Sequence, residues 1–226
     1  MAIRAPIDRF DRRRILLRAL SIAASTVPFG AAFGVIAADA GLTVWETVGF
    51  SSIVFTGSAQ FAAVAILGKE GAVATAVGAG ILLNLRSLAF GIVLAPDLSG
   101  PRWWRALVSQ LVIDESTAVA TAERDRRLRR YGFLAGGIAV FVLWNVSTLI
   151  GSVGLQSAGD LVVRWGLDAT IPAAFLALLW PRLADPGQRR VAIGVALIAL
   201  ALTPIAPPGL PVVASITAIG LAARRR

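Results

Sequence analysis

Charged and amide side chains stand inside the apolar stretches of this chain, where they could bind a polar solute. Arg86 follows Asn84 in the stretch NLRSLAFG, Asp114 and Glu115 are adjacent in LVIDESTAVATA, and Gln60 stands in TGSAQFAAV. A guanidinium group can hold a carboxylate through two parallel hydrogen bonds, and a carboxyl group in apolar surroundings can carry a proton. These residue types therefore predict a substrate site at Gln60, Asn84 and Arg86, with proton coupling at Asp114 or Glu115.

Several other kinds of chemistry are not expected. The 226 residues include neither histidine nor cysteine, so the usual ligands of zinc and haem and the base of a Ser-His pair are missing. A serine such as Ser58 or Ser87 would have no base to activate it. We therefore expect no enzyme activity, no cofactor and no metal site.

The composition is that of a membrane protein. Hydrophobic residues make up 57% of the chain and charged residues 15%, and the mean hydropathy is +0.76. Soluble domains carry about 25% charged residues, and a helix needs about 20 apolar residues to cross the hydrocarbon core. The sequence therefore predicts an all-α, polytopic helical bundle. Its single transmembrane domain spans residues 19–223, between a basic arm at 1–18 and a basic tail at 224–226.

Eight apolar runs are long enough to be considered as crossings, although the last two are short and rich in flanking prolines. We expect seven or eight transmembrane segments, with the last two forming a hairpin or a re-entrant pair. The runs are Ala19–Ala38, Val48–Leu67, Ala72–Ala95, Ala106–Ala122, Tyr131–Ser152, Leu161–Pro181, Val191–Ala206 and Leu210–Ala223.

The Lys and Arg residues predict an orientation. With eight crossings and a cytoplasmic amino terminus, 18 of the 22 Lys and Arg residues lie on the cytoplasmic side, three lie outside and Arg86 lies within the membrane. Cytoplasmic loops of membrane proteins carry such an excess. Topology therefore explains the net charge of +9 better than nucleic-acid binding does.

Two prolines predict broken helices. Pro28 and Gly30 lie in TVPFG of the first run, and Pro172 lies in TIPAAF of the sixth. By the charge count these two runs have opposite directions, and such interrupted pairs can mark inverted repeats around a substrate site. Backbone groups freed at Pro28 and Gly30 would then bind an amino acid. Two ordinary proline kinks are the alternative.

Arg86 needs a partner, because an arginine near the middle of a membrane segment costs at least about 2.5–3.5 kcal/mol. Asp114 and Glu115 can each supply it. Adjacent helical residues point about 100° apart, so one acid can pair with Arg86 while the other carries a proton. The sequence leaves open which acid does which. A static ion pair that only joins two helices is the alternative.

The chain resembles the AzlC family, the large subunit of branched-chain amino-acid exporters. The resemblance covers most of the chain and is carried by VPFGAAFGVIAADAGL, FSSIVFTGSAQFAAVAIL, NLRSLAFGIVLAP and VIDESTAVAT across residues 27–121, and by GLDATIPAAFLALLWPRL at 166–183. The family often has an imidazole directly after N-L-R, where this sequence has Ser87. The resemblance therefore implies an exporter whose proton carrier, in this chain, must be a carboxylate.

The resemblance also implies surroundings for the protein: the bacterial inner membrane, an amino-acid substrate and a small AzlD-like membrane subunit as partner. Export would be secondary active transport by alternating access, because no cytoplasmic segment that would dock an ATPase is evident. Two other functions remain open at this point. One is a structural or assembly subunit that does not itself transport, and the other is a channel.

Overall fold

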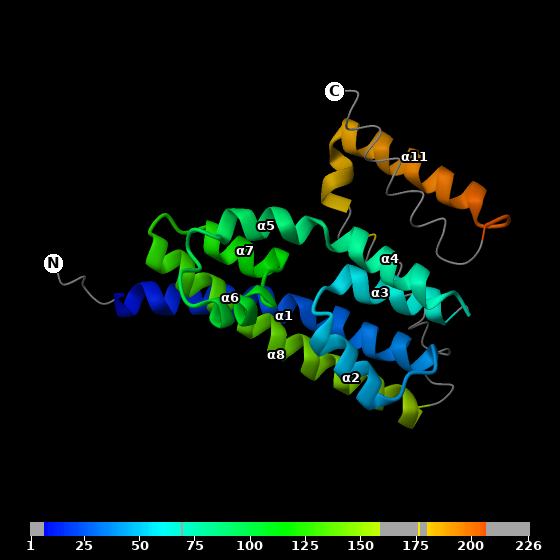
Figure 1. The fold of residues 1–226 in the computed structure, drawn as a ribbon, viewed down its shortest axis with the longest axis horizontal. Coiled ribbons are helices and arrows are strands. Elements are labelled where there is room, and N and C mark those ends of the chain that lie inside the picture. Colours follow the sequence, from blue (N-terminus) through cyan, green and yellow to red (C-terminus); the bar gives the residue numbers. More distant parts are fainter. Residues whose placement is uncertain (1–6, 69, 159–175, 177–179, 207–226) are drawn as a thin grey trace.

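The computed structural model describes residues 7–68, 70–158, 176 and 180–206, and nearly all of them lie in helices (Figure 1). The predicted all-α membrane bundle is confirmed, and no strand occurs among the described residues. Three predictions lie outside the described residues. They are the segment Leu161–Pro181 with its break at Pro172, of which only 176, 180 and 181 are described, the segment Leu210–Ala223 and the tail at 224–226.

Three helical stretches of the described chain are long and apolar enough to cross a membrane, and they span Arg9–Asp39, Val73–Leu94 and Arg126–Gly154. The first is α1 (Arg9–Asp39) and the third belongs to α8 (Arg126–Ala158). The second consists of α4 (Val73–Asn84) and α5 (Arg86–Leu94), which Leu85 separates. The chain described here therefore has three candidate crossings.

Helices α1 and α8 run side by side and in the same direction along the length of the bundle (Figure 1). Glycines allow the two backbones to approach closely. A side chain at Gly34 would collide with the carbonyl oxygen of Thr148, and one at Gly151 would collide with that of Ala31. Small residues at such crossings are typical of membrane helices, because close packing there replaces the hydrophobic effect.

Helices α2 (Val44–Ile53) and α3 (Gly57–Leu67) form a hairpin that enters and leaves the bundle at one end. α2 begins just after the carboxyl end of α1. Gly68, at the end of α3, lies against Ala40, so that a Cβ on this glycine would be 3.0 Å from the Ala40 Cβ. Both ends of the hairpin therefore lie where α1 ends.

Helices α6 (Arg102–Ser109) and α7 (Asp114–Thr121) form a second hairpin, which enters from the opposite end. Asp97, just before α6, accepts hydrogen bonds from Arg126 and Arg129 at the start of α8. Glu123, just after α7, pairs with Arg14 near the start of α1. Both ends of this hairpin therefore lie where α1 and α8 begin.

Two predicted crossings are accordingly wrong. Val48–Leu67 and Ala106–Ala122 are each a re-entrant hairpin, since helices of 8–11 residues reach only about 12–17 Å of the roughly 30 Å core. The chain turns at β-branched residues of low helix propensity. Thr56 and Ile113 both have extended backbones, with φ of −152° and −130°.

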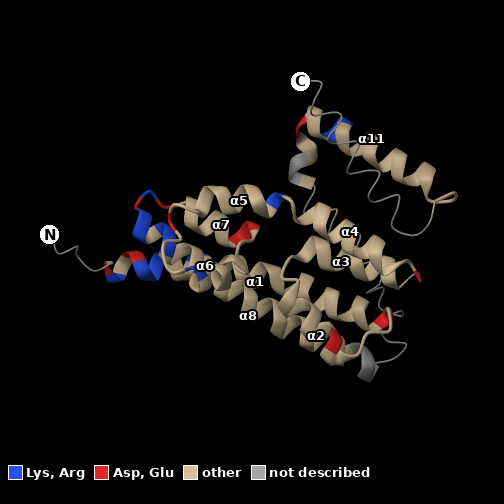
Figure 2. Cartoon of the chain, viewed as in Figure 1, with Lys and Arg blue, Asp and Glu red and all other residues tan. Residues whose placement is uncertain are grey.

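The hairpins also correct the predicted distribution of charge. Arg102 and Arg105 do not lie opposite the other arginines, because α6 begins at the same end as α1 and α8. Within α1 to α8, every described Lys or Arg except Arg86 lies at this end, which we call the basic end (Figure 2).

The predicted break at Pro28 is wrong, because α1 continues through this proline as a helix of 31 residues. Proline removes one backbone hydrogen bond, and membrane helices tolerate this where neighbouring helices and hydroxyl groups support the chain. α8 packs along α1 here and supports the chain on either side of Pro28. The run Val191–Ala206 largely corresponds to α11 (Pro186–Leu202), which packs on the short helix η2 (Trp180–Ala184).

Arginines hold both ends of the α6–α7 hairpin at the basic end. Glu123 is 6% exposed, and its carboxylate accepts hydrogen bonds from Arg14 at 2.7 and 2.8 Å and from Arg18 at 3.1 Å. Asp97 is 8% exposed and is paired with Arg126 and Arg129. These ion pairs attach the hairpin to α1 and α8.

We expect Glu123→Gln to destabilise the fold by about 1.5–3 kcal/mol near neutral pH, because it weakens charge-assisted hydrogen bonds in a buried setting. The hydrogen bonds from Arg14 lower the pKa of Glu123 below its ordinary 4.5. Their stabilisation is therefore present above pH 4.5 and is lost as the pH falls through the lower folded-state pKa. Melting temperatures in detergent across this pH range should converge for the wild type and the variant in acid. Glu70→Gln, in an exposed loop, is the control, and equal melting temperatures at neutral pH would contradict the assignment.

Candidate functional site

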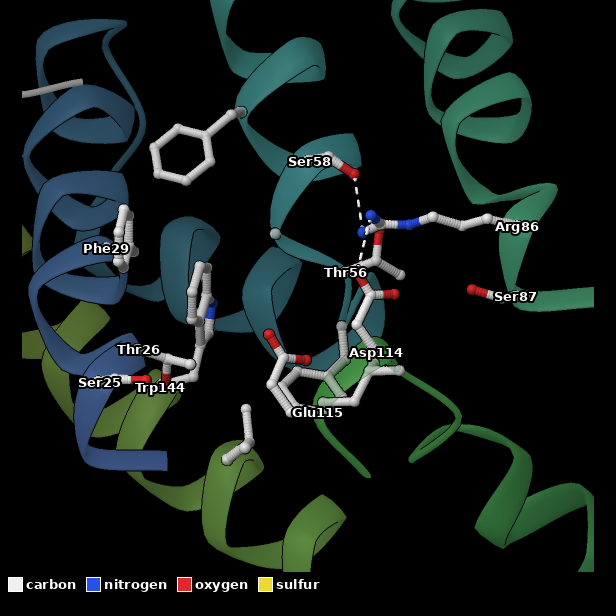
Figure 3. A pocket seen from close by; sticks show the side chains of 15 residues that line it. Ser25, Thr26, Phe29, Thr56, Ser58, Arg86, Ser87, Asp114, Glu115 and Trp144 are labelled. Carbon is white, nitrogen blue, oxygen red and sulfur yellow. Dashed lines mark hydrogen bonds and ion pairs between the residues drawn. The ribbon is translucent and has the colours of Figure 1, made fainter. Parts of the chain in front are cut away.

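A cavity of about 500 Å³ lies in the middle of the bundle, where the two hairpins meet the broken helix α4–α5 (Figure 3). α1 and α8 complete its wall. Its charged lining residues are Arg86, Asp114 and Glu115. Its hydroxyl-bearing lining residues are Ser25, Thr26, Thr56, Ser58 and Ser87. Its apolar lining residues are Phe29, Phe55, Phe61, Ile113, Val140 and Trp144.

Arg86 is the first residue of α5, and the break at Leu85 directs its side chain towards the cavity (Figure 3). Its Nη1 lies 2.9 Å from Oδ2 of Asp114, and its Nη2 donates a hydrogen bond of 3.2 Å to Oγ of Ser58. Sequence reasoning left open which acid pairs with Arg86, and the structure shows Asp114. The guanidinium group therefore joins α5 to both hairpins.

The amino terminus of α3 faces the same space. Thr56 is its N-cap residue and Gly57 and Ser58 are its first residues, and all three line the cavity. The first backbone N–H groups of a helix lack intrahelical partners and carry a partial positive charge. The Thr56 hydroxyl is buried and has no hydrogen-bond partner among the described residues. Together with Arg86, this terminus forms a region rich in hydrogen-bond donors, which we call the donor side.

Asp114 and Glu115 are the first two residues of α7, at the tip of the second hairpin, where a helix start favours negative charge. Asp114 is paired with Arg86, while its Oδ1 is buried without a partner in the described chain. Glu115 also faces the cavity (Figure 3), and no described residue forms an ion pair with it. The cavity thus holds two carboxylates and one guanidinium group.

Two glutamines support the hairpin tips from outside the cavity lining. Gln60 is fully buried, and its amide donates to the carbonyls of Ser51 and Val54 while accepting from the Trp144 indole at 3.0 Å. It therefore satisfies the backbone of the break between α2 and α3, because a bare carbonyl within a membrane is costly. The structure gives this predicted substrate residue a supporting position.

Gln110 connects the two tips directly. It lies at the turn after α6, and its amide donates hydrogen bonds to the carbonyls of Ser52 at 3.0 Å and Ile53 at 2.7 Å, at the end of α2. These hydrogen bonds join hairpins that enter from opposite ends. This contact was not predicted from the sequence, because it depends on the break between α6 and α7 at 110–113.

The remaining predicted site residues lie beside the cavity or away from it. Asn84 ends α4 and accepts a hydrogen bond from Ser87, which does line the cavity. Pro28 is exposed, and Gly30 is buried against Ser147 of α8. Phe29, Phe61 and Trp144 form an aromatic wall of the cavity that was not predicted from the sequence. The position of Phe29 next to Pro28 and the single tryptophan of α8 were the available signals.

Comparison with known proteins finds one matching family and relatives that are membrane proteins. The model of a family described as AzlC protein matches residues 21–157, a stretch that contains both hairpins and every residue of the cavity lining. An uncharacterized membrane protein of Archaeoglobus fulgidus is 29% identical over 192 residues, which cover 82% of each chain. The inner membrane protein YgaZ of Escherichia coli is 28% identical over 172 residues, or 71% of this chain and 68% of the relative. No solved structure gives a significant match.

Proposed function

This chain belongs to the AzlC family of membrane proteins, and we propose that it exports branched-chain or similar apolar amino acids by secondary active transport. The observation that carries this proposal is the central cavity, in which a donor side, two carboxylates and an aromatic wall face one another. Ligand pockets in proteins commonly enclose about 300–1,000 Å³ and combine apolar walls with a few polar groups. A cavity of 500 Å³ is therefore large enough for one amino acid.

The donor side suits the substrate carboxylate. Arg86 and Ser58 offer side-chain donors there, and the amino terminus of α3 adds backbone N–H groups and a favourable dipole. The side chain of the amino acid would lie against Phe29, Phe61 and Trp144, which bury branched aliphatic groups without a polar cost. Asp114 is paired with Arg86 at 2.9 Å, and a substrate carboxylate would compete with Asp114 for the guanidinium group.

The two hairpins suit alternating access. They enter from opposite ends and meet at the cavity, so the opening of one tip would expose the cavity to one side of the membrane only. Transporters with discontinuous helices place their substrate sites at such midplane breaks. Proton uptake by Asp114 or Glu115 would couple this movement to the proton gradient. We place the basic end in the cytoplasm, following the positive-inside rule.

A small AzlD-like subunit is the proposed partner, and efflux from cells tests the whole proposal. Leucine, isoleucine, valine and methionine would be preloaded into cells that express this protein alone, with the small subunit, or as Asp114→Asn. We expect faster efflux with the partner and its loss in the variant at equal membrane levels. Unchanged efflux of all four amino acids would contradict export. Efflux that the small subunit supports equally well without this protein would favour a structural subunit.

The contact between the hairpin tips makes a separate prediction. Gln110→Leu removes two hydrogen bonds that hold the tips together, so the cavity should open more often, by about tenfold. Because the chain has no cysteine, a single Ser87→Cys substitution reports on the cavity directly. We expect a water-soluble maleimide to label this cysteine faster when Gln110→Leu is added.

The matched control for this labelling experiment is Ser109→Ala, since the Ser109 hydroxyl donates only to Ala106 in its own helix. Equal labelling rates in the Gln110→Leu and Ser109→Ala proteins would show that the tips are not held by Gln110.

A further inference from the structure

The cavity has a charge that its own residues do not balance. Arg86 is the only cation in the described lining, and it is paired with Asp114 at 2.9 Å. Glu115 faces the same cavity from the start of α7, and no described arginine or lysine forms an ion pair with it. A carboxylate within a membrane requires a cation or a proton. The site therefore has room for one further positive charge.

The hydroxyl groups of α1 show which kind of cation fits. Ser25 donates its hydroxyl proton to the carbonyl of Ile22 at 2.7 Å, and Thr26 donates to that of Ala23 at 2.8 Å. Both hydroxyls line the cavity with their protons already used, so they offer it only lone pairs. With Glu115, they make this wall rich in hydrogen-bond acceptors, and we call it the acceptor side.

The two sides of the cavity are thus of opposite character. Figure 3 shows Arg86 and Ser58 on the donor side and Ser25 and Thr26 across from them, with Glu115 at the part of the acceptor side that is nearer to Arg86. An α-amino acid carries a carboxylate, which only accepts hydrogen bonds, and an ammonium group, which only donates them. A zwitterion across the cavity would satisfy both sides at once, whereas a simple carboxylate would leave Glu115 without a cation.

We propose that Glu115 binds the α-ammonium group of the substrate, and that this group and a proton occupy the same carboxylate in turn. The inference rests on the proposed function, since it requires an amino-acid substrate. A protonated Glu115 has no negative charge with which to hold the ammonium group. Binding of a proton therefore releases the amino acid, and binding of the amino acid releases the proton.

This competition produces exchange. On the outer side a proton from solution adds to Glu115 as the ammonium group leaves. The proton is carried inward on the carboxyl group, and it enters the cytoplasm when the next amino acid binds. The other charged groups that face this site are Asp114 on α7 and Arg86 on α5. The described lining residues of α1, α3 and α8 are uncharged.

Binding of three ligands to the purified protein tests the inference. They are leucine, 4-methyl-2-oxopentanoate, which lacks the ammonium group, and 3-methylbutylamine, which lacks the carboxylate. We expect the wild type to bind leucine most tightly and to release a proton as it does so, measured by calorimetry in buffers of different protonation enthalpy. Glu115→Gln should weaken leucine binding by about tenfold to a hundredfold and abolish the proton release, with little change for the oxo acid.

The controls separate the outcomes. Glu70→Gln, in an exposed loop, should behave as the wild type does. Glu115→Asp, which keeps the carboxylate, should retain proton release with weaker binding, and it replaces Glu115→Gln if that variant does not fold. Leucine binding with unchanged affinity and proton release in Glu115→Gln would overturn the inference alone. Failure of the wild type to bind leucine would overturn the proposed function as well.

Discussion

Arg86→Ala is expected to reduce amino-acid efflux by about tenfold to a hundredfold, because it removes the charged donor of the donor side, and hydrogen bonds to charged groups contribute about 1.5–3 kcal/mol. The substitution removes the cation of the donor side and leaves the Asp114 carboxylate without its partner. Efflux from proteoliposomes at matched protein content measures the effect. Arg86→Lys should be intermediate, since it keeps the charge but not the planar fork that reaches Asp114 and Ser58 together.

Two further variants identify the cause of that loss. Arg105→Ala removes an exposed arginine at the basic end and should leave efflux unchanged. Arg86→Ala combined with Asp114→Asn removes the unpaired charge, so it should restore the amount of folded protein without restoring efflux. Full efflux in Arg86→Ala, alone or combined with Asp114→Asn, would show that the guanidinium group does not bind substrate.

Gly34→Val is expected to prevent correct packing of α1 on α8. A Cβ at this position would meet the carbonyl oxygen of Thr148 and would lie 2.6 Å from the backbone nitrogen of Ser152. Neither backbone atom can turn aside as a side chain can, so the two helices would have to separate. Overpacking usually costs about 1–3 kcal/mol. Here the cost should exceed this range, because the Gly34 contact lies within the parallel pair that supports both hairpins.

Thermal unfolding followed by size-exclusion chromatography in detergent measures this effect. Gly151→Ala should be strongly destabilising for the same reason, since its Cβ would meet the carbonyl of Ala31. Gly78→Ala is the matched control, because nothing lies within 4 Å of a Cβ at that position in α4. A melting temperature for Gly34→Val equal to that of Gly78→Ala would contradict the described helix pair.

The class of this protein and the chemistry of its site could be predicted from the amino-acid sequence. Long apolar runs with few charges allow only a helical bundle in a membrane, because each helix satisfies its own backbone. The cost of placing Arg86 in such a run predicted an acidic partner in the run that contains Asp114 and Glu115, and the structure places the three residues in one cavity. These conclusions follow from local composition and from the free-energy cost of placing one arginine in a membrane segment.

The positions at which the helices break and turn back could not be predicted from the sequence, because they depend on contacts between distant parts of the fold. Pro28 is the local signal for a break, yet α1 continues through it beside α8. The observed break at 54–56 has its free carbonyls satisfied by Gln60, and the end of α2 is bound by Gln110 from the other hairpin. A break within a membrane is stable only when groups elsewhere in the fold complete its hydrogen bonds. Those groups are brought together by folding, so no single stretch of sequence specifies the break.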